Sequence, residues 1–395
     1  MKSVFSGYYF LFFVAMASTQ PFLSLYLSGR GLSSEQIGVL MAVGAVAGMF
    51  AQPLLGYVND RATDTRRLLI LSAIISPAIY ALYALFHPYA LLLVVAFFYA
   101  VVQSTGPIAD AMAIQSGNEY GFSYGQVRLW GALSFAITTM VAGYVYHVIG
   151  ISYSFVFYAG LSLILVFVAR FLPRTPASTH STEMLVRGVW NVAKNTRLMV
   201  FIGLCFVLAT AITVNFTYLP LYFKALHYPL GWVGLNFTVA ALVEVPLFYV
   251  SGPIIKKFGA RVVIVIASAF YVAKYVLMGF APPPALVIAI QVLDGVGYAF
   301  YWSAGVQIVA NLSPKGRSAT AQTLYGAVAS SLSSIVGSVV GGWLLEGYGP
   351  KAMYFVNAGI GGIALLGYII FARHRSPQLD SSHPVEAGAV PESNS

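Results

Sequence analysis

Apolar stretches of about twenty residues recur along nearly the whole chain, and short polar turns separate them. A helix needs about 20 mostly apolar residues to cross the hydrocarbon core of a bilayer. The pattern predicts twelve membrane-spanning helices, called spans below, at 5–28, 34–58, 68–87, 89–114, 126–148, 151–172, 198–223, 231–255, 262–281, 284–311, 319–345 and 351–372.

The longest polar interruption, residues 173–197, divides the spans six and six. We therefore predict an all-α membrane protein with two six-helix bundles, at 1–172 and 198–372, joined by this central loop. Residues 373–395 carry too few apolar side chains to pack, so we expect a disordered tail.

Composition agrees with a membrane protein. Of the 395 residues, 59% are hydrophobic and only 8% are charged. Soluble domains average about 25% charged residues, so a soluble globular protein is excluded.

The net charge of +9 does not indicate a nucleic-acid partner, because the basic residues are concentrated in alternate loops. One set of alternate loops carries only three basic residues, Arg30, Lys224 and Lys351, whereas the other carries sixteen. Basic residues concentrate in cytoplasmic loops. The asymmetry predicts a multi-pass protein of the cytoplasmic (inner) membrane with both termini in the cytoplasm.

The two halves resemble each other. A shift of 196 positions places residues 22–26 on 218–222, Gly38 on Gly234 and Gly56 on Gly252 without a gap. Agreement at several positions in one register indicates an internal duplication, as in transporters whose halves surround a midplane site.

Two opposite charges, Asp110 and Arg128, lie eighteen positions apart on adjacent spans. A charge facing lipid costs roughly 2.5–3.5 kcal/mol on insertion scales, so we expect this pair to neutralise each other inside a bundle, beside a polar cavity. A structural ion pair at the helix ends is the alternative.

The second half holds three further charges within spans, Glu244, Lys274 and Asp294. Three acids and two bases then leave one carboxylate without a permanent partner, and such a group tends to hold a proton in a low dielectric. Asp294 or Glu244 should share Lys274. A purely architectural cluster remains the alternative.

The loop after the second span combines a glycine, an aspartate and three basic residues: Gly56, Asp60, Arg61, Arg66 and Arg67. We expect Gly56 to permit a close helix approach and Asp60 to accept bonds at the start of the next helix. This loop resembles the signature loop of the major facilitator superfamily, and the resemblance covers residues 5 to about 372. It implies that the loop is a conformational latch between the halves.

Within the superfamily the chain resembles the lactose and phenylpropionate permeases. Residues 21–61 are similar to their first two spans, and Asp110 and Arg128 match an acid and an arginine that bind sugar hydroxyls there. Phe135 matches the position of a tryptophan that stacks on sugar in that group. Lys274 and Asp294 match an arginine and a histidine, and the resemblance favours Asp294 as the proton-coupling acid.

Other function classes lack support in the sequence. There is no phosphate-binding GxxxxGK[ST] motif, no metal-ligand spacing among the histidines and no hydrolase triad, so we expect no enzyme activity, no metal and no cofactor beyond a proton gradient. The single cysteine, Cys205, excludes an intrachain disulfide.

We therefore predict a proton-coupled symporter of a small organic solute that works as a monomer by alternating access. A sugar or oligosaccharide is the first candidate solute, followed by a nucleoside or an aromatic acid. A proton-antiport exporter of drugs or sugars, and a non-transporting membrane sensor, are the alternatives.

Overall fold

The computed structural model describes residues 1–61, 64–174, 192–314 and 317–373, without the side chains of Asp60 and Ala319. The central loop and the tail predicted from sequence therefore lie largely outside the described residues. Every regular element of the described chain is a helix.

The first half contains six spans, two of which are interrupted. Its helices are α1 (Lys2–Ala17), η1 (Gln20–Phe22), α2 (Leu23–Gly29), α3 (Ser34–Asp60), α4 (Arg66–Leu85), α5 (Tyr89–Gln103), α6 (Gly106–Tyr120), α7 (Tyr124–Ile149), η2 (Ile151–Tyr153) and α8 (Ser154–Ala169).

The second half repeats this arrangement. Its helices are α10 (Thr196–Ala225), α11 (Trp232–Phe258), α12 (Ala260–Gly279), α13 (Pro284–Leu312), α14 (Ser318–Gly326), the π-helical turn η3 (Ala327–Leu332) and α15 (Ser333–Arg373).

Eleven described helices are long and apolar enough to cross a membrane. The last, Thr320–Arg373, has 54 residues, far more than one crossing needs. Its backbone leaves the helical region at Gly349, which has a φ of 80°, and Pro350 follows. This break separates the eleventh and twelfth predicted spans, so the fold is consistent with the predicted twelve.

Local sequence explains where helices start and break. Ser33 and Gln36 form a reciprocal capping box at the start of α3, with bonds of 3.2 and 3.0 Å. The fourth span breaks between α5 and α6, just before Pro107, which lacks the N–H that a continuous helix needs. Hydroxyls bond the carbonyls beside the break: Ser72 donates to Val102 and Ser104 to Ala100, both at 2.7 Å.

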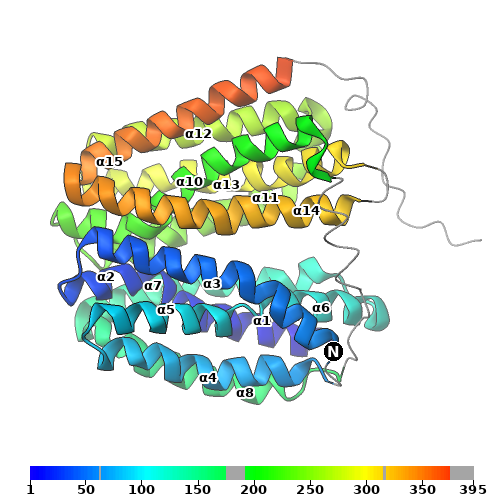
Figure 1. The fold of residues 1–395 in the computed structure, drawn as a ribbon, viewed down its shortest axis with the longest axis vertical. Helices are drawn as coiled ribbons and strands as arrows, with labels where there is room; N and C mark the ends of the chain where they lie inside the picture. Colours follow the sequence, from blue (N-terminus) through cyan, green and yellow to red (C-terminus); the bar gives the residue numbers. More distant parts are fainter. Residues whose placement is uncertain (62–63, 175–191, 315–316, 374–395) are drawn as a thin grey trace, which may run out of the picture.

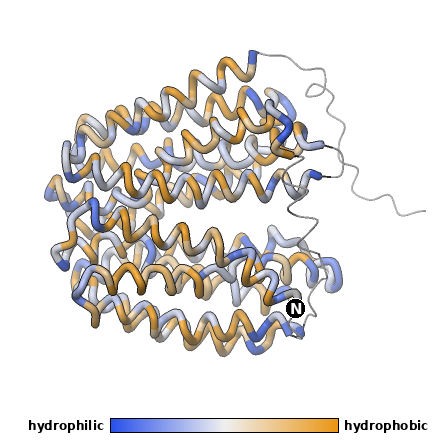
Figure 2. Tube along the Cα trace, in the orientation of Figure 1, coloured by the Kyte–Doolittle hydropathy of each residue, from blue (hydrophilic) through white to orange (hydrophobic). Residues whose placement is uncertain are grey.

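The two halves form two layers of helices, with α1–α8 in one and α10–α15 in the other (Figure 1). The start of α1 and the end of α15 lie at the same end of the molecule, here called the terminal end, and the opposite end is called the outer end (Figure 1). Hydrophilic residues gather near the helix ends, and apolar residues occupy the middle (Figure 2).

The halves touch at the outer end. The side-chain hydrogen bonds between halves include those from the Ser34 N–H to Glu346 (2.8 Å), from Lys224 to the Ser28 hydroxyl (2.8 Å) and between Thr139 and Thr238 (3.2 Å). The ribbons of α3 and α14 diverge toward the terminal end (Figure 1). This arrangement closes the outer end.

Glycines allow this close contact. A Cβ on Gly38 would lie 2.3 Å from the Ser338 carbonyl oxygen, and one on Gly234 would lie 2.0 Å from that of Thr139. Ser28 and Lys224 are 196 positions apart, which is the shift that relates the halves in sequence. Contact between equivalent positions is expected near the axis that relates two parallel repeats.

Candidate functional site

Asp110 and Arg128 do not form a direct ion pair. Direct ion pairs form instead between Asp64 and Arg66 and between Lys274 and Asp294. Asp110, on α6, instead accepts a hydrogen bond of 2.6 Å from the hydroxyl of Tyr9 on α1. The packing of α1 against this region thus supplies a neutral donor where the sequence led us to expect a guanidinium.

Arg128, near the start of α7, lies over an aromatic ring. Its guanidinium carbon is 4.1 Å from the centre of Phe13, a cation–π geometry. Tyr124 lies in electrostatic range of both Asp110 and Arg128 and contacts Tyr9 edge-on, with ring centres 6.1 Å apart. A phenol therefore connects the two charges, which share one polar region at the α1–α6–α7 contact.

Phe135, two turns after Arg128 on α7, is half-buried and packs against the main hydrophobic core. Its carbonyl accepts a bond from Thr139, one of the residues that contact the second half. The third predicted substrate residue therefore lies between the Arg128 region and the interface of the halves.

The second half provides a direct ion pair. Lys274, on α12, lies 2.5 Å from an Asp294 carboxylate oxygen on α13. The Lys274 side chain is fully buried, whereas that of Asp294 keeps 23% of its surface exposed. Asp294, not Glu244, takes the lysine, and its exposed part is available to water or solute.

Glu244 connects the two halves electrostatically. This half-buried side chain on α11 lies in range of Asp294 in its own half and of Arg128 in the other. Tyr298, one turn after Asp294, lies in range of all three. Arg128, Glu244 and Asp294 therefore lie within electrostatic range of one residue, Tyr298, and Asp110 and Arg128 lie within range of Tyr124.

The latch loop differs from expectation at Gly56, and Asp64 supplies bonds at the start of α4 that the sequence analysis did not foresee. A Cβ on Gly56 would meet nothing within 4 Å, so this glycine makes no close helix approach here, because the terminal end of α3 diverges from the second half. The cap of α4 comes from Asp64: one oxygen accepts from the Arg66 N–H at 3.1 Å, and the other pairs with the Arg66 guanidinium at 3.0 Å.

The remaining latch residues lie at the surface or outside the description. Arg61 stacks on Tyr57, with its guanidinium carbon 3.7 Å from the ring centre, and Arg67 is exposed. Arg66 also donates to the Arg170 carbonyl at 2.8 Å, which ties the start of α4 to the end of α8. The Asp60 side chain lies outside the described residues.

The sequence analysis missed three side chains that lie beside the charges, Tyr9, Phe13 and Tyr124, and it did not relate Tyr298 to Asp294. Spacing along a helix could have pointed to Tyr9, Phe13 and Tyr298. Tyr9 and Phe13 are four residues apart on one helix face, and Tyr298 is four residues after Asp294. Aromatic residues are abundant throughout this chain, so the spacing alone did not separate these from the rest.

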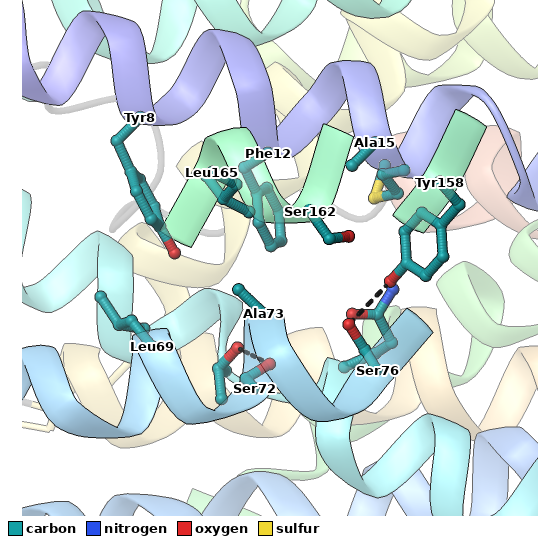
Figure 3. Close-up of a pocket in the computed structure, with 13 residues that line it drawn as sticks. Tyr8, Phe12, Ala15, Leu69, Ser72, Ala73, Ser76, Tyr158, Ser162 and Leu165 are labelled. Carbon is teal, nitrogen blue, oxygen red and sulfur yellow. Dashed lines mark hydrogen bonds between the residues drawn. The ribbon is translucent and has the colours of Figure 1, made fainter. Parts of the chain in front are cut away.

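A small polar cavity lies inside the first half, between α1, α4, α8 and the α5–α6 break (Figure 3). Its volume of about 20 Å³ leaves room for about one water molecule. The Tyr158 hydroxyl donates to Ser76 at 3.0 Å, and Thr105 donates to Ser72 at 3.2 Å (Figure 3). All its lining residues belong to the first half, so it is separate from the region that the halves share.

Known proteins resemble the chain over nearly its whole length. The chain is 31% identical over 360 residues to the maltose permease of Geobacillus stearothermophilus, covering 89% of this chain and 90% of that protein. It is 26% identical to a probable 3-phenylpropionic acid transporter of Escherichia coli K12, covering 89% and 92%.

A crystal structure of the nucleoside transporter NupG has the same fold. It superimposes with a TM-score of 0.85 at 16% identity and covers 95% of this chain and 99% of that one. Residues 3–356 match the family model described as the MFS_1 like family. The helix arrangement, the repeat and these matches agree: the chain belongs to the MFS_1-like family of major facilitator transporters.

Proposed function

We propose that this transporter is a proton-coupled symporter of a small, hydroxyl-rich organic solute. A sugar or oligosaccharide is the first candidate, before a nucleoside or an aromatic acid. The maltose permease that it resembles supports a sugar. The protein acts as a monomer in the cytoplasmic membrane, with its terminal end in the cytoplasm, and needs no cofactor besides the proton gradient.

One observation carries this proposal: charged groups from both halves share one region at membrane depth. Arg128 of the first half lies in electrostatic range of Glu244, next to the Lys274–Asp294 pair of the second half. Three acids face two bases, so one acid lacks a permanent cation. Adding a proton to that acid makes the net charge of the cluster zero. A neutral cluster has a lower free-energy cost in a low dielectric than a charged one.

The transport cycle follows from this balance. With the outer end open, an acid of the Glu244–Asp294 pair takes a proton and the solute binds beside Arg128. The halves then rock to the arrangement described above, closed at the outer end by the Lys224, Glu346 and Thr139 contacts. Solute and proton leave at the terminal end, where the halves diverge.

The test measures proton flux with transport. Proteoliposomes in a weakly buffered medium receive maltose, and a pH electrode records the medium. We expect alkalinisation in step with uptake of labelled maltose. Acidification would identify an antiporter, and uptake without a pH change would identify a uniporter; either result contradicts symport.

Two variants test which acid carries the coupled proton. Glu244→Gln and Asp294→Asn mimic protonated acids, so we expect the responsible one to lose uphill uptake but keep maltose exchange across the membrane. Glu35→Gln, on the exposed outer turn of α3, is the control that keeps both activities. Coupled uptake in both neutral variants would exclude this pair as the proton carrier.

A further inference from the structure

A second cavity, of about 280 Å³, is lined by residues of both halves. Its walls come from the η1–α2 segment, α3, the end of α4 and α5 in the first half, and from Phe216 of α10 in the second. The α3 residues that line it run from Leu40 to Gln52, about 18 Å of helix at 1.5 Å per residue. The cavity is therefore elongated, and its volume is close to the lower limit of ligand pockets, about 300 Å³.

Three glutamines line this cavity: Gln20, Gln52 and Gln103. The Gln103 amide donates to the Tyr99 hydroxyl at 3.1 Å, and Gln103 also lines the small cavity of the first half. Among the described residues, neither Gln20 nor Gln52 has a side-chain hydrogen bond, and both side chains are exposed. An amide without a partner is costly at membrane depth, so these groups require water or a polar solute.

Phe216 gives the cavity an aromatic wall from the second half. Its ring is 41% exposed and contacts Phe237 at the edge, with ring centres 5.3 Å apart. Amides together with an aromatic ring suit a sugar ring, whose hydroxyls bond to amides and whose C–H face packs on an aromatic ring.

The cavity and the Asp110–Arg128 region lie along the same span. Gln103 is the last residue of α5, and Asp110 follows it by seven residues, across the α5–α6 break. A single solute with two linked rings could therefore contact both places.

We propose that this cavity is a subsite for one ring of a di- or oligosaccharide, with Gln20, Gln52 and Gln103 as hydrogen-bonding residues and Phe216 as the stacking surface. The other end of the sugar lies near Asp110 and Arg128. This inference rests on the proposed sugar transport and specifies the length of the substrate.

The test compares a disaccharide with a monosaccharide. Maltose and glucose affinities are measured by calorimetry on purified full-length wild type, Gln20→Leu and Gln52→Leu. Each variant loses a hydrogen bond to the distal ring only, so we expect maltose to bind roughly 3- to 10-fold more weakly. Glucose, held at Asp110 and Arg128, should change by less than about twofold by the same reasoning.

Gln307→Leu is the matched control. That glutamine lies on α13, and its amide donates to Asn311 at 3.0 Å, so its loss should leave both affinities as in wild type. Unliganded thermal stability of every variant is measured to separate misfolding from lost binding, and Gln20→Leu and Gln52→Leu serve as independent tests of the same cavity.

The outcomes distinguish the two proposals. Unchanged maltose affinity in folded Gln20→Leu and Gln52→Leu would overturn the subsite and leave sugar transport standing. An equal loss for glucose and maltose would also overturn it, since the cavity would then hold the only ring. If wild type binds neither sugar, the proposed sugar transport fails, and the subsite fails with it.

Discussion

Four of the five charged side chains within the spans have a close partner, and the partners differ in chemistry. A phenol donates to Asp110, an aromatic ring lies under Arg128, and a carboxylate pairs with Lys274. Each contact lowers the free-energy cost of a charge in low dielectric. A hydroxyl or ring partner is displaced more readily than an ion pair, which suits Asp110 and Arg128 to binding a solute.

Replacing Lys274 with alanine should destabilise the protein, because the Asp294 carboxylate loses its cation. Removing one partner of a buried pair costs about 3–5 kcal/mol, and partial exposure of Asp294 reduces this. We expect the melting temperature of purified Lys274→Ala to fall by roughly 5 °C.

The double variant Lys274→Ala/Asp294→Ala removes both charges and should regain at least half of that loss. The exposed Lys351→Ala is the control with an unchanged melting temperature. A double variant no more stable than Lys274→Ala would show that the pair does not account for the effect.

Helix contacts between the halves depend on glycine. Gly234 of α11 lies against the Thr139 carbonyl of α7, and Gly342 of α15 lies against the Ser34 carbonyl at the start of α3. Small residues let helices approach where lipid gives no hydrophobic drive for association. These helix contacts close the outer end. They therefore determine which end of the transporter is open in this conformation.

A Gly234→Leu variant should hold the outer end open, because its side chain would occupy the space of the Thr139 carbonyl. In this variant, a cysteine placed at Leu25, in the cavity between the halves at the outer end, should react with a soluble maleimide several-fold faster than the same cysteine in the wild-type background. Gly160→Leu is the control, since a Cβ there meets nothing within 4 Å. Equal labelling in both backgrounds would contradict the closing role of Gly234.

The start of α1 and the end of α15 lie at one end of the molecule, and the inter-half hydrogen bonds lie at the other (Figure 1). We propose that the terminal end faces the cytoplasm because cytoplasmic loops accumulate basic residues. The described conformation is then open toward the cytoplasm.

Cysteine labelling of intact cells tests this orientation. Cys205 is buried, so it contributes no background. We expect a membrane-impermeant maleimide to label a cysteine placed at exposed His87, in the outer α4–α5 turn, and not one at exposed Lys257, at the terminal end of α11. Lysed cells should label both, and the reverse pattern in intact cells would invert the topology.

Much of the architecture could be predicted from local composition. Apolar length set the spans, the polar segment at 173–197 divided them six and six, and the basic loops suggested an orientation. The cost of placing polar groups in hydrocarbon acts on each segment by itself, so these features do not depend on knowing which helices meet.

The partners of individual side chains were decided by the tertiary structure. Asp110 bonds to a residue 101 positions away, and Asp64 accepts a bond from the Arg66 N–H at the start of α4. The cavity glutamines come from three separate spans. A contact between distant segments depends on how helices pack and on where kinks such as Gly349 turn the chain, and neither hydropathy nor spacing along one helix contains that information. Composition determined that charges lie inside the membrane; packing determined what each one touches.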